Sequence, residues 1–262
     1  MNKYIFFLLL SISVFFTSCI STRDLIYLQQ KDGGTAESVI SVVPMKPYRL
    51  QTFDAISISI KSIDPKLTSI FSTVSSGESA KSGAGLYFDG FNVDDHGNIR
   101  IPILGEMNVM GYTVDEVRER IEKKLLAEYF TKEANIFVTV KLGGFKYTIN
   151  GEIGSTGTKT LFQDRVTILE AIANAGDITL TGDRKAVTIM RQSPTGTEMH
   201  DIDLTDVKVM QSPYYYLQPN DYIFIKPLKQ KTWGTGKTFL ESFGTFVTLL
   251  SFATTTFFLL KK

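Results

Sequence analysis

Few side chains in this sequence could support catalysis or metal binding, and they are scattered. The only cysteine is Cys19, and the only histidines, His96 and His200, do not stand at a spacing typical of a metal site. Asp94 and Asp95 could together bind a cation, but carboxylates before a glycine are also the usual hydrogen-bond acceptors of a turn. The sequence therefore predicts no catalytic residue, no metal site and no cofactor, and we do not expect an enzyme.

Residues 233–238, WGTGKT, are similar to the end of a phosphate-binding loop. That loop needs a glycine five residues before the glycine of its Gly-Lys pair, and Lys231 stands there instead. Nucleotide binding is therefore not expected. Nucleic acid is not an expected partner either, because the formal net charge is only +1.

The single thiol lies at the end of an N-terminal targeting segment. Lys3 supplies a positive charge, residues 5–16 are apolar, and Phe16-Thr17-Ser18 precede Cys19. This arrangement resembles the lipobox of bacterial lipoproteins. The resemblance implies cleavage before Cys19 and lipidation of that residue, with palmitate among the acyl chains; the alternative is an accidental cysteine at the end of a signal peptide.

Residues 239–260 form an apolar stretch with one charged residue, Glu241. As a helix, this stretch would reach about 33 Å, enough to cross a hydrocarbon core of about 30 Å. At about 100° per residue, one face carries the polar side chains Glu241, Thr245, Thr248 and Thr255. In a ring of such helices this face could line a water-filled pore. An ordinary tail anchor is the alternative.

The run Tyr214, Tyr215 and Tyr216 could contact a glycan, because an aromatic ring can stack on the apolar face of a pyranose. Packing within the protein, or against another protomer, is the alternative for these rings.

The first half of the chain predicts mixed α and β structure. Residues 55–63 alternate apolar and polar side chains, as a half-buried strand does. Residues 64–86 are rich in Ser and Gly and predict a long surface loop. Residues 92–103 predict a hairpin whose turn is 95–98, with Gly97 or Asn98 at positive φ.

A helix should follow, with Thr113 as its N-cap and Glu116 completing a capping box. We expect it to reach Tyr129, and its buried face should contain Val114, Val117, Ile121, Leu125 and Leu126. A further strand is predicted over residues 136–141.

Gly143-Gly144 marks the boundary to a second unit. This unit should begin with a strand over 145–149 and a loop over 151–157. A short helix over 166–175 should be capped by Thr167, ended by Gly176 and packed through Leu169. Further strands are expected over 186–191, 197–204 and 222–226.

These motifs, in this order, resemble the bacterial polysaccharide export outer-membrane lipoproteins, the Wza-like family. The resemblance rests on the stretch from Val93-Asp94 to Gly111 in the first unit. In the second unit it rests on Ile149-Asn150-Gly151-Glu152-Ile153, residues 171–176 and the final strand. The first unit departs from the pattern at Phe53, where a glycine is usual, and the second at Thr156, where a proline is usual.

The resemblance implies an α+β fold with an N-terminal polysaccharide export domain, one β-grasp domain of the soluble-ligand-binding (SLBB) type and a C-terminal amphipathic transmembrane helix. The expected division of the chain is 1–18 signal peptide, 19–43 lipidated linker, 44–142 export domain, 145–228 β-grasp domain, 229–238 basic linker and 239–260 pore-forming helix.

The resemblance also implies the function, which is export of a capsular or exopolysaccharide from the periplasm through an outer-membrane channel. The channel would be a homo-oligomeric ring, for which an octamer is one candidate. Its expected partners are outer-membrane lipid, the polysaccharide and an inner-membrane co-polymerase that can carry a tyrosine kinase. The rival hypotheses are a monomeric lipoprotein whose β-grasp domain binds a soluble glycan or other ligand, and a hydrolase, which would need paired carboxylates.

Overall fold

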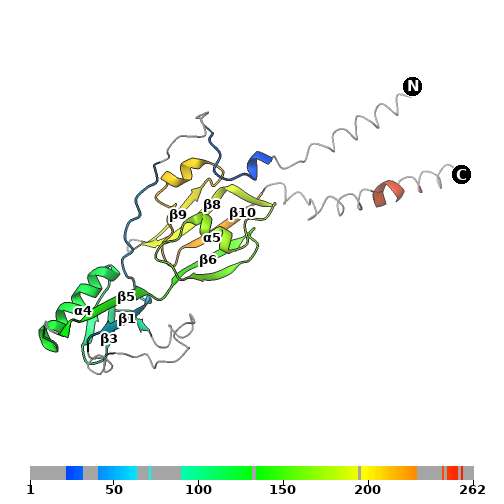
Figure 1. Cartoon of the computed structure of the whole chain (residues 1–262). Coiled ribbons are helices and arrows are strands. Elements are labelled where there is room, and N and C mark those ends of the chain that lie inside the picture. The colour runs from blue at the N-terminus through cyan, green and yellow to red at the C-terminus, as the bar shows by residue number, and fades with distance from the viewer. Residues whose placement is uncertain are drawn as a thin grey trace.

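The computed structural model describes residues 22–31, 41–63, 71, 90–131, 134–193, 196–228, 244, 247–252 and 255. The described residues form two folded units, each with its own hydrophobic core, that follow one another near Gly144 (Figure 1). Three of the predicted site residues, Cys19, Glu241 and Thr245, lie outside the described residues, as do the predicted signal peptide and most of the loop over 64–86.

The first unit is built around the strand β1 (Ala55–Lys61). This strand lies between β2 (Phe91–Asn92) and β5 (Phe137–Leu142) and is antiparallel to both. Its three isoleucines, Ile56, Ile58 and Ile60, are buried, because alternate residues of a strand face the same side. The strand predicted over 55–63 is therefore confirmed, although it ends two residues earlier.

The hairpin predicted over residues 92–103 is wrong. The turn itself forms, with Gly97 at φ +81°, but β2 pairs with β1. The partner of β3 (Asn98–Ile101) is β4 (Gly105–Asn108), which follows it directly. Ile103 at φ +68° helps to reverse the chain between them, and a β-branched residue in that conformation gives no turn signal in the sequence.

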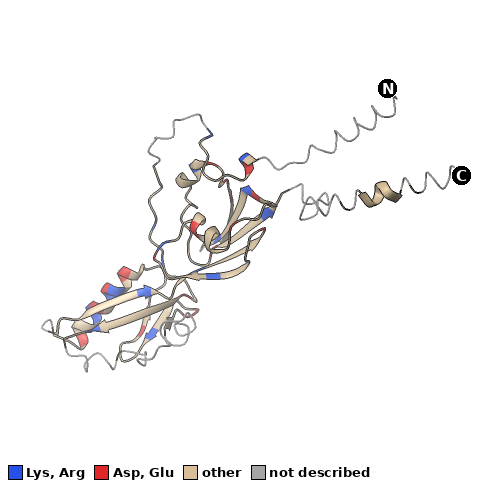
Figure 2. Cartoon of the chain, turned by 45° about the vertical axis from the view of Figure 1, so that its right-hand side comes forward, with Lys and Arg blue, Asp and Glu red and all other residues tan. Residues whose placement is uncertain are grey.

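The helix α4 (Val114–Glu128) begins at the predicted capping box. The Thr113 amide donates to Glu116 Oε2 at 2.8 Å, and the Glu116 amide donates to Thr113 Oγ1 at 3.2 Å. Acidic and basic residues both occur along this helix (Figure 2). Leu126 is 37% exposed, so its assignment to the buried face is wrong: it lies about 100° around the helix from the fully buried Leu125.

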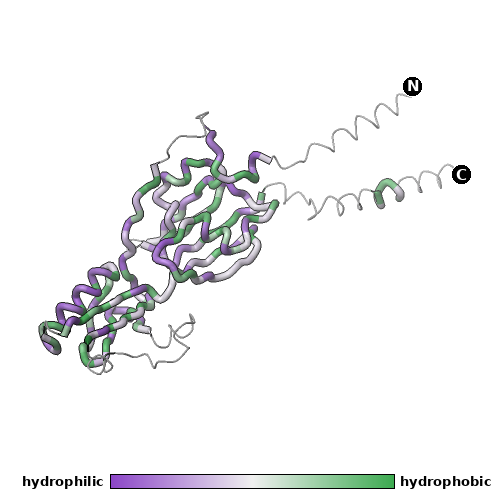
Figure 3. Tube along the Cα trace, in the orientation of Figure 1, coloured by the Kyte–Doolittle hydropathy of each residue, from purple (hydrophilic) through white to green (hydrophobic). Residues whose placement is uncertain are grey.

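The second unit is a five-stranded sheet in which one face is covered by a helix. The strand order is β7 (Gly157–Leu161), β6 (Phe145–Gly151), β10 (Tyr222–Pro227), β8 (Gly182–Ser193) and β9 (Gly196–Ile202). Only the central pair β6–β10 is parallel among these strands. Hydrophobic residues are frequent along the strands (Figure 3).

The helix α5 (Ile168–Asn174) packs on this sheet through Ile168, Ala171 and Ile172, which are buried in the same core as the strands. Its capping box joins Thr167 and Glu170, and Gly176 at φ +84° follows its last turn, as predicted. Leu169 is only partly buried, so its placement on the fully buried face is a correction. β7 was not predicted, because GTKTL has no apolar–polar alternation.

An N-terminal arm, residues 22–31, packs on the second unit, although we expected only a linker there. It contains the short helix η2 (Thr22–Asp24), and Gln29 forms an isolated parallel bridge with Asp206, which caps η5 (Val207–Gln211). The arm thereby connects the first described residues to the second unit.

Truncation of the two neighbouring apolar side chains of α5 should give different losses of stability. Ile172→Ala empties a fully buried site and should lower the free energy of unfolding of the second unit by about 2–5 kcal/mol. Leu169→Ala serves as the matched control and should cost clearly less, because its side chain is partly in water. Denaturant unfolding of both variants checks this order, and equal losses would contradict the assignment of the helix face.

Candidate functional site

A turn of the same design precedes the central strand of each unit. Residues 50–54 (LQTFD) lead into β1 and residues 217–221 (LQPND) lead into β10. In both turns the aspartate amide donates to the glutamine carbonyl, at 3.3 Å in the first and 3.1 Å in the second. In return, the aspartate Oδ2 accepts a hydrogen bond from the backbone amide of the glutamine, at 2.8 Å in the first turn and 2.7 Å in the second. The repeat L-Q-x-x-D-x-I-x-I is visible in the sequence but was not among our predictions.

The residue before each aspartate has a left-handed backbone. Phe53 has φ +68° and Asn220 has φ +69°. Asparagine tolerates this conformation, whereas it is strained for a phenylalanine. The Phe53 side chain is 80% exposed, so the strain is not offset by packing within the chain.

The two turns meet where the units join. Asp54 is buried, and its Oδ2 also accepts a hydrogen bond from the Tyr48 hydroxyl at 2.8 Å. Its Oδ1 accepts from Asn220 Nδ2 at 3.3 Å, so one carboxyl group of the first unit is bonded to the turn of the second. Burial raises the pKa of Asp54, while the hydrogen bonds from Gln51, Tyr48 and Asn220 oppose that shift. Burial and the nearby Asp54 also raise the pKa of the Tyr48 hydroxyl.

The equivalent carboxylate of the second turn has a different partner. Arg191 of β8 binds Asp221 with two hydrogen bonds, Nε to Oδ1 at 2.9 Å and Nη2 to Oδ2 at 2.7 Å. Burial raises the pKa of the Asp221 carboxyl, and the guanidinium opposes that shift. Both buried carboxylates are therefore used to fix turns.

A groove of about 900 Å³ runs along this joint. One wall is the segment 46–52 with Met110 and Gly111, and the other is the end of the β8–β9 hairpin with Gln218. The first wall is held by Arg49, whose Nη1 donates to the Gly111 carbonyl at 2.7 Å. This groove could not be predicted from the sequence, because its two walls come from segments about 80 or more residues apart.

The three tyrosines predicted as glycan contacts lie together, but at least one ring is already engaged within the chain. Tyr214 stacks on His200 with ring centroids 4.0 Å apart, and the Arg191 guanidinium carbon lies 5.0 Å from its centroid. Its hydroxyl donates to Glu198 at 3.1 Å. Tyr215 and Tyr216 pack edge to face at 5.2 Å. These contacts favour the packing alternative for Tyr214.

Two of the predicted pore-lining residues are described, Thr248 and Thr255. Each hydroxyl donates to the carbonyl four residues earlier, Gly244 at 3.0 Å and Ser251 at 2.7 Å. Such bonds satisfy a hydroxyl on an apolar helix. Among the described residues, no helix is long and apolar enough to span a membrane.

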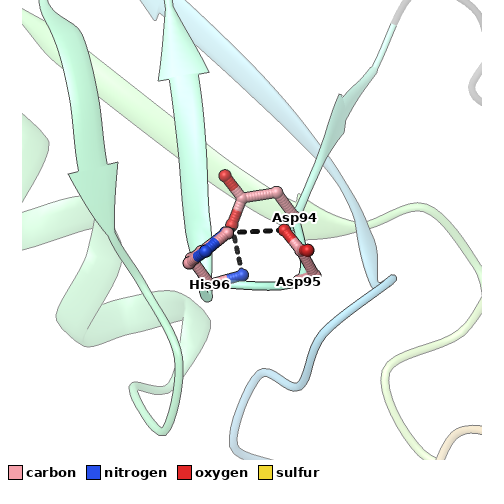
Figure 4. Close-up of side chains that lie close together, drawn as sticks. All are labelled: Asp94, Asp95 and His96. Atoms are coloured by element: carbon pink, nitrogen blue, oxygen red, sulfur yellow. Dashed lines mark hydrogen bonds and ion pairs between the residues drawn. The ribbon is translucent and has the colours of Figure 1, made fainter.

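Asp94, Asp95 and His96 are the one group of potential metal ligands within the described ranges (Figure 4). All three are exposed. Asp94 Oδ1 accepts hydrogen bonds from the backbone amides of His96 and Asn98, at 2.9 and 2.7 Å. The His96 Nδ1 atom lies 2.7 Å from Asp95 Oδ1. The Asp94 carboxylate therefore stabilises the turn before β3, as the sequence predicted.

The described residues form a two-unit α+β protein with a groove at the joint between its units. Residues 42–141, essentially the first unit, match the family of polysaccharide biosynthesis/export proteins. Residues 42–141 are therefore similar to this family, and the resemblance to polysaccharide export proteins is confirmed.

Two curated relatives are similar over 149 residues. The EPS I polysaccharide export outer membrane protein EpsA of Ralstonia nicotianae is 29% identical, and that of Ralstonia solanacearum is 28% identical. The match covers 55% of this chain and 39% of each relative, so the chain spans well under half the length of these relatives.

The raised pKa of Asp54 predicts a pH dependence of stability. A neutral Asp54 stabilises the fold fully below its ordinary pKa of 3.8, and this contribution is lost as the pH rises through the raised value in the folded protein. The free energy of unfolding of Asp54→Asn should lack this decrease. Denaturant unfolding at a series of pH values measures it, with Asp115→Asn on the exposed face of α4 as control; identical slopes for wild type and Asp54→Asn would contradict the prediction.

Proposed function

We propose that this chain is a subunit of an outer-membrane complex that exports a capsular or exopolysaccharide from the periplasm. The match of residues 42–141 to the export family and the names of the two relatives support this proposal. We further assign the second unit to the SLBB-type β-grasp class. Its mixed sheet with the parallel pair β6–β10 and the packed α5 supports that assignment.

The observation that carries the proposal is that both segments expected at the membrane leave the second unit at the same place, the start of β8. Asp24 of the N-terminal arm forms an ion pair with Lys185 at 2.6 Å. At the other end of the chain, Pro227 pairs with Gly182 and the Leu228 amide donates to the Thr181 carbonyl at 2.8 Å. A lipid before the arm and a helix after β10 would therefore attach one end of this unit to the membrane.

The arm is fixed by further contacts. The Leu28 amide donates a hydrogen bond to the Leu204 carbonyl at 3.1 Å, and Lys31 forms an ion pair with Asp203 at 2.6 Å. The Tyr27 hydroxyl donates to Asp177, and burial together with that bond raises its pKa to about 12. Thr22 is the third residue after Cys19, so a lipid on Cys19 would be at most about 11 Å of extended chain from it. In this proposal the second unit lies next to the outer membrane and the first points into the periplasm.

The proposed exit for the polymer is a ring of C-terminal helices, with Glu241, Thr245, Thr248 and Thr255 facing a water-filled lumen. The chain would assemble as a homo-oligomer and receive polymer from an inner-membrane co-polymerase that can carry a tyrosine kinase. We propose passage without chemistry. Asp54 and Asp221, the buried carboxylates among the described residues, support this view because both are bound by structural hydrogen bonds.

Deletion of the chain in its host should abolish surface polysaccharide while polymer synthesis continues, and wild-type protein should restore it. Cys19→Ser should not be labelled by a fatty-acid probe and should restore export poorly, because the proposed lipid is missing. Quantification of cell-surface and intracellular polymer checks both results. Unchanged surface polysaccharide in the deletion strain would refute the proposed function.

Single cysteines in the C-terminal segment should react according to helix face. A charged, membrane-impermeant thiol reagent should modify Thr248→Cys and Thr255→Cys, and should spare Leu250→Cys, which lies about 200° from Thr248. The native thiol at Cys19 would be blocked by the proposed acylation. Equal protection of all three positions would indicate a plain membrane anchor and would contradict the pore.

A further inference from the structure

We propose that the groove along the joint of the two units binds a segment of an anionic polysaccharide. This inference rests on the proposed function and specifies a contact site and a charge for its substrate. The site is formed by residues 46–52 on one side and by the β8–β9 hairpin and Gln218 on the other.

The lining is rich in groups that hydrogen-bond sugars. Three side-chain amides, those of Gln51, Gln192 and Gln218, reach the groove from three different segments. None of these three amides forms a hydrogen bond with another described residue. A carboxamide offers two donors and one acceptor, which suits vicinal hydroxyl groups. Thr197 adds a hydroxyl at the hairpin.

The charge of the groove points to an anionic ligand. Among the residues that the structure describes, its lining contains Lys46 and Arg49 and no carboxylate. Arg49 is partly neutralised by Glu116 at 3.4 Å, but Lys46 has no ion pair within the described part of the chain. Both cations are exposed, so they can meet the carboxylates of a uronic-acid polymer without leaving water.

The groove is also held in shape. The hydrogen bond from Asn220 to Asp54 links the two sides of the groove. The Tyr48 hydroxyl donates a further hydrogen bond to the same buried carboxyl group. A site with fixed walls loses less conformational freedom when a flexible polymer binds. The groove therefore combines walls that are bonded to one another with polar side chains on both walls.

Binding to the purified, detergent-solubilised full chain tests the proposal. Oligogalacturonate is the anionic probe and dextran oligosaccharides of similar length are the neutral one, with Kd measured by microscale thermophoresis. Wild type should bind oligogalacturonate in preference to dextran. The double variant Lys46→Glu, Gln192→Glu should bind oligogalacturonate about tenfold more weakly, because a hydrogen bond to a charged group is lost and repulsion is added.

Lys123→Glu, on the exposed outer face of α4, is the matched control and should change Kd by less than about twofold. No binding of oligogalacturonate by wild type, equal binding of dextran, or an unchanged Kd in the double variant would overturn the proposal. If the double variant also exports normally while deletion of the chain abolishes export, the groove is refuted and the proposed function stands. If deletion has no effect on export, the proposed function itself fails.

Discussion

The buried carboxyl group of Asp54 is the point at which the two units of this protein depend on one another. It accepts bonds from its own turn, from Tyr48 and from Asn220 of the second unit, and it lies directly before β1, the middle strand of the first unit. Removing this carboxyl group would leave three donors without their partner, and the cost should be largest for the partly buried Tyr48 and Gln51 and smallest for the exposed Asn220. The first turn, the first strand and the orientation of the units would be affected together.

The second turn repeats this design with a different outcome. Asp221 also precedes a central strand, but its carboxylate is neutralised by Arg191 from the neighbouring strand. The ion pair between Asp221 and Arg191 lies within the second unit and fixes the turn to a strand of that unit. Asp54, in contrast, is hydrogen-bonded to Asn220 of the other unit. The joint therefore contains one carboxyl whose protonation is set mainly by burial, and it borders the groove in which we place the polymer.

Much of the secondary structure could be predicted from local signals. Capping boxes at Thr113 and Thr167 define both helices because their bonds link residues only three apart. Strand pairing was harder to predict from the sequence. β3 pairs with β4 because the chain reverses at Ile103, whose left-handed backbone conformation no sequence rule favours. The N-terminal arm was missed for a similar reason, since its partners Lys185 and Leu204 are distant in sequence. The groove arises only when the walls come together, so residue types alone could not indicate it.

The proposed export function requires that several copies of the chain form a ring whose C-terminal helices meet in the outer membrane. The mass of the full-length protein in detergent, measured by native mass spectrometry, tests this requirement most directly. A ring predicts a mass several times that of one processed chain, and conversion to single chains when residues 239–260 are removed. A single-chain mass for the full-length protein in every mild detergent would contradict the account and favour a monomeric ligand-binding lipoprotein.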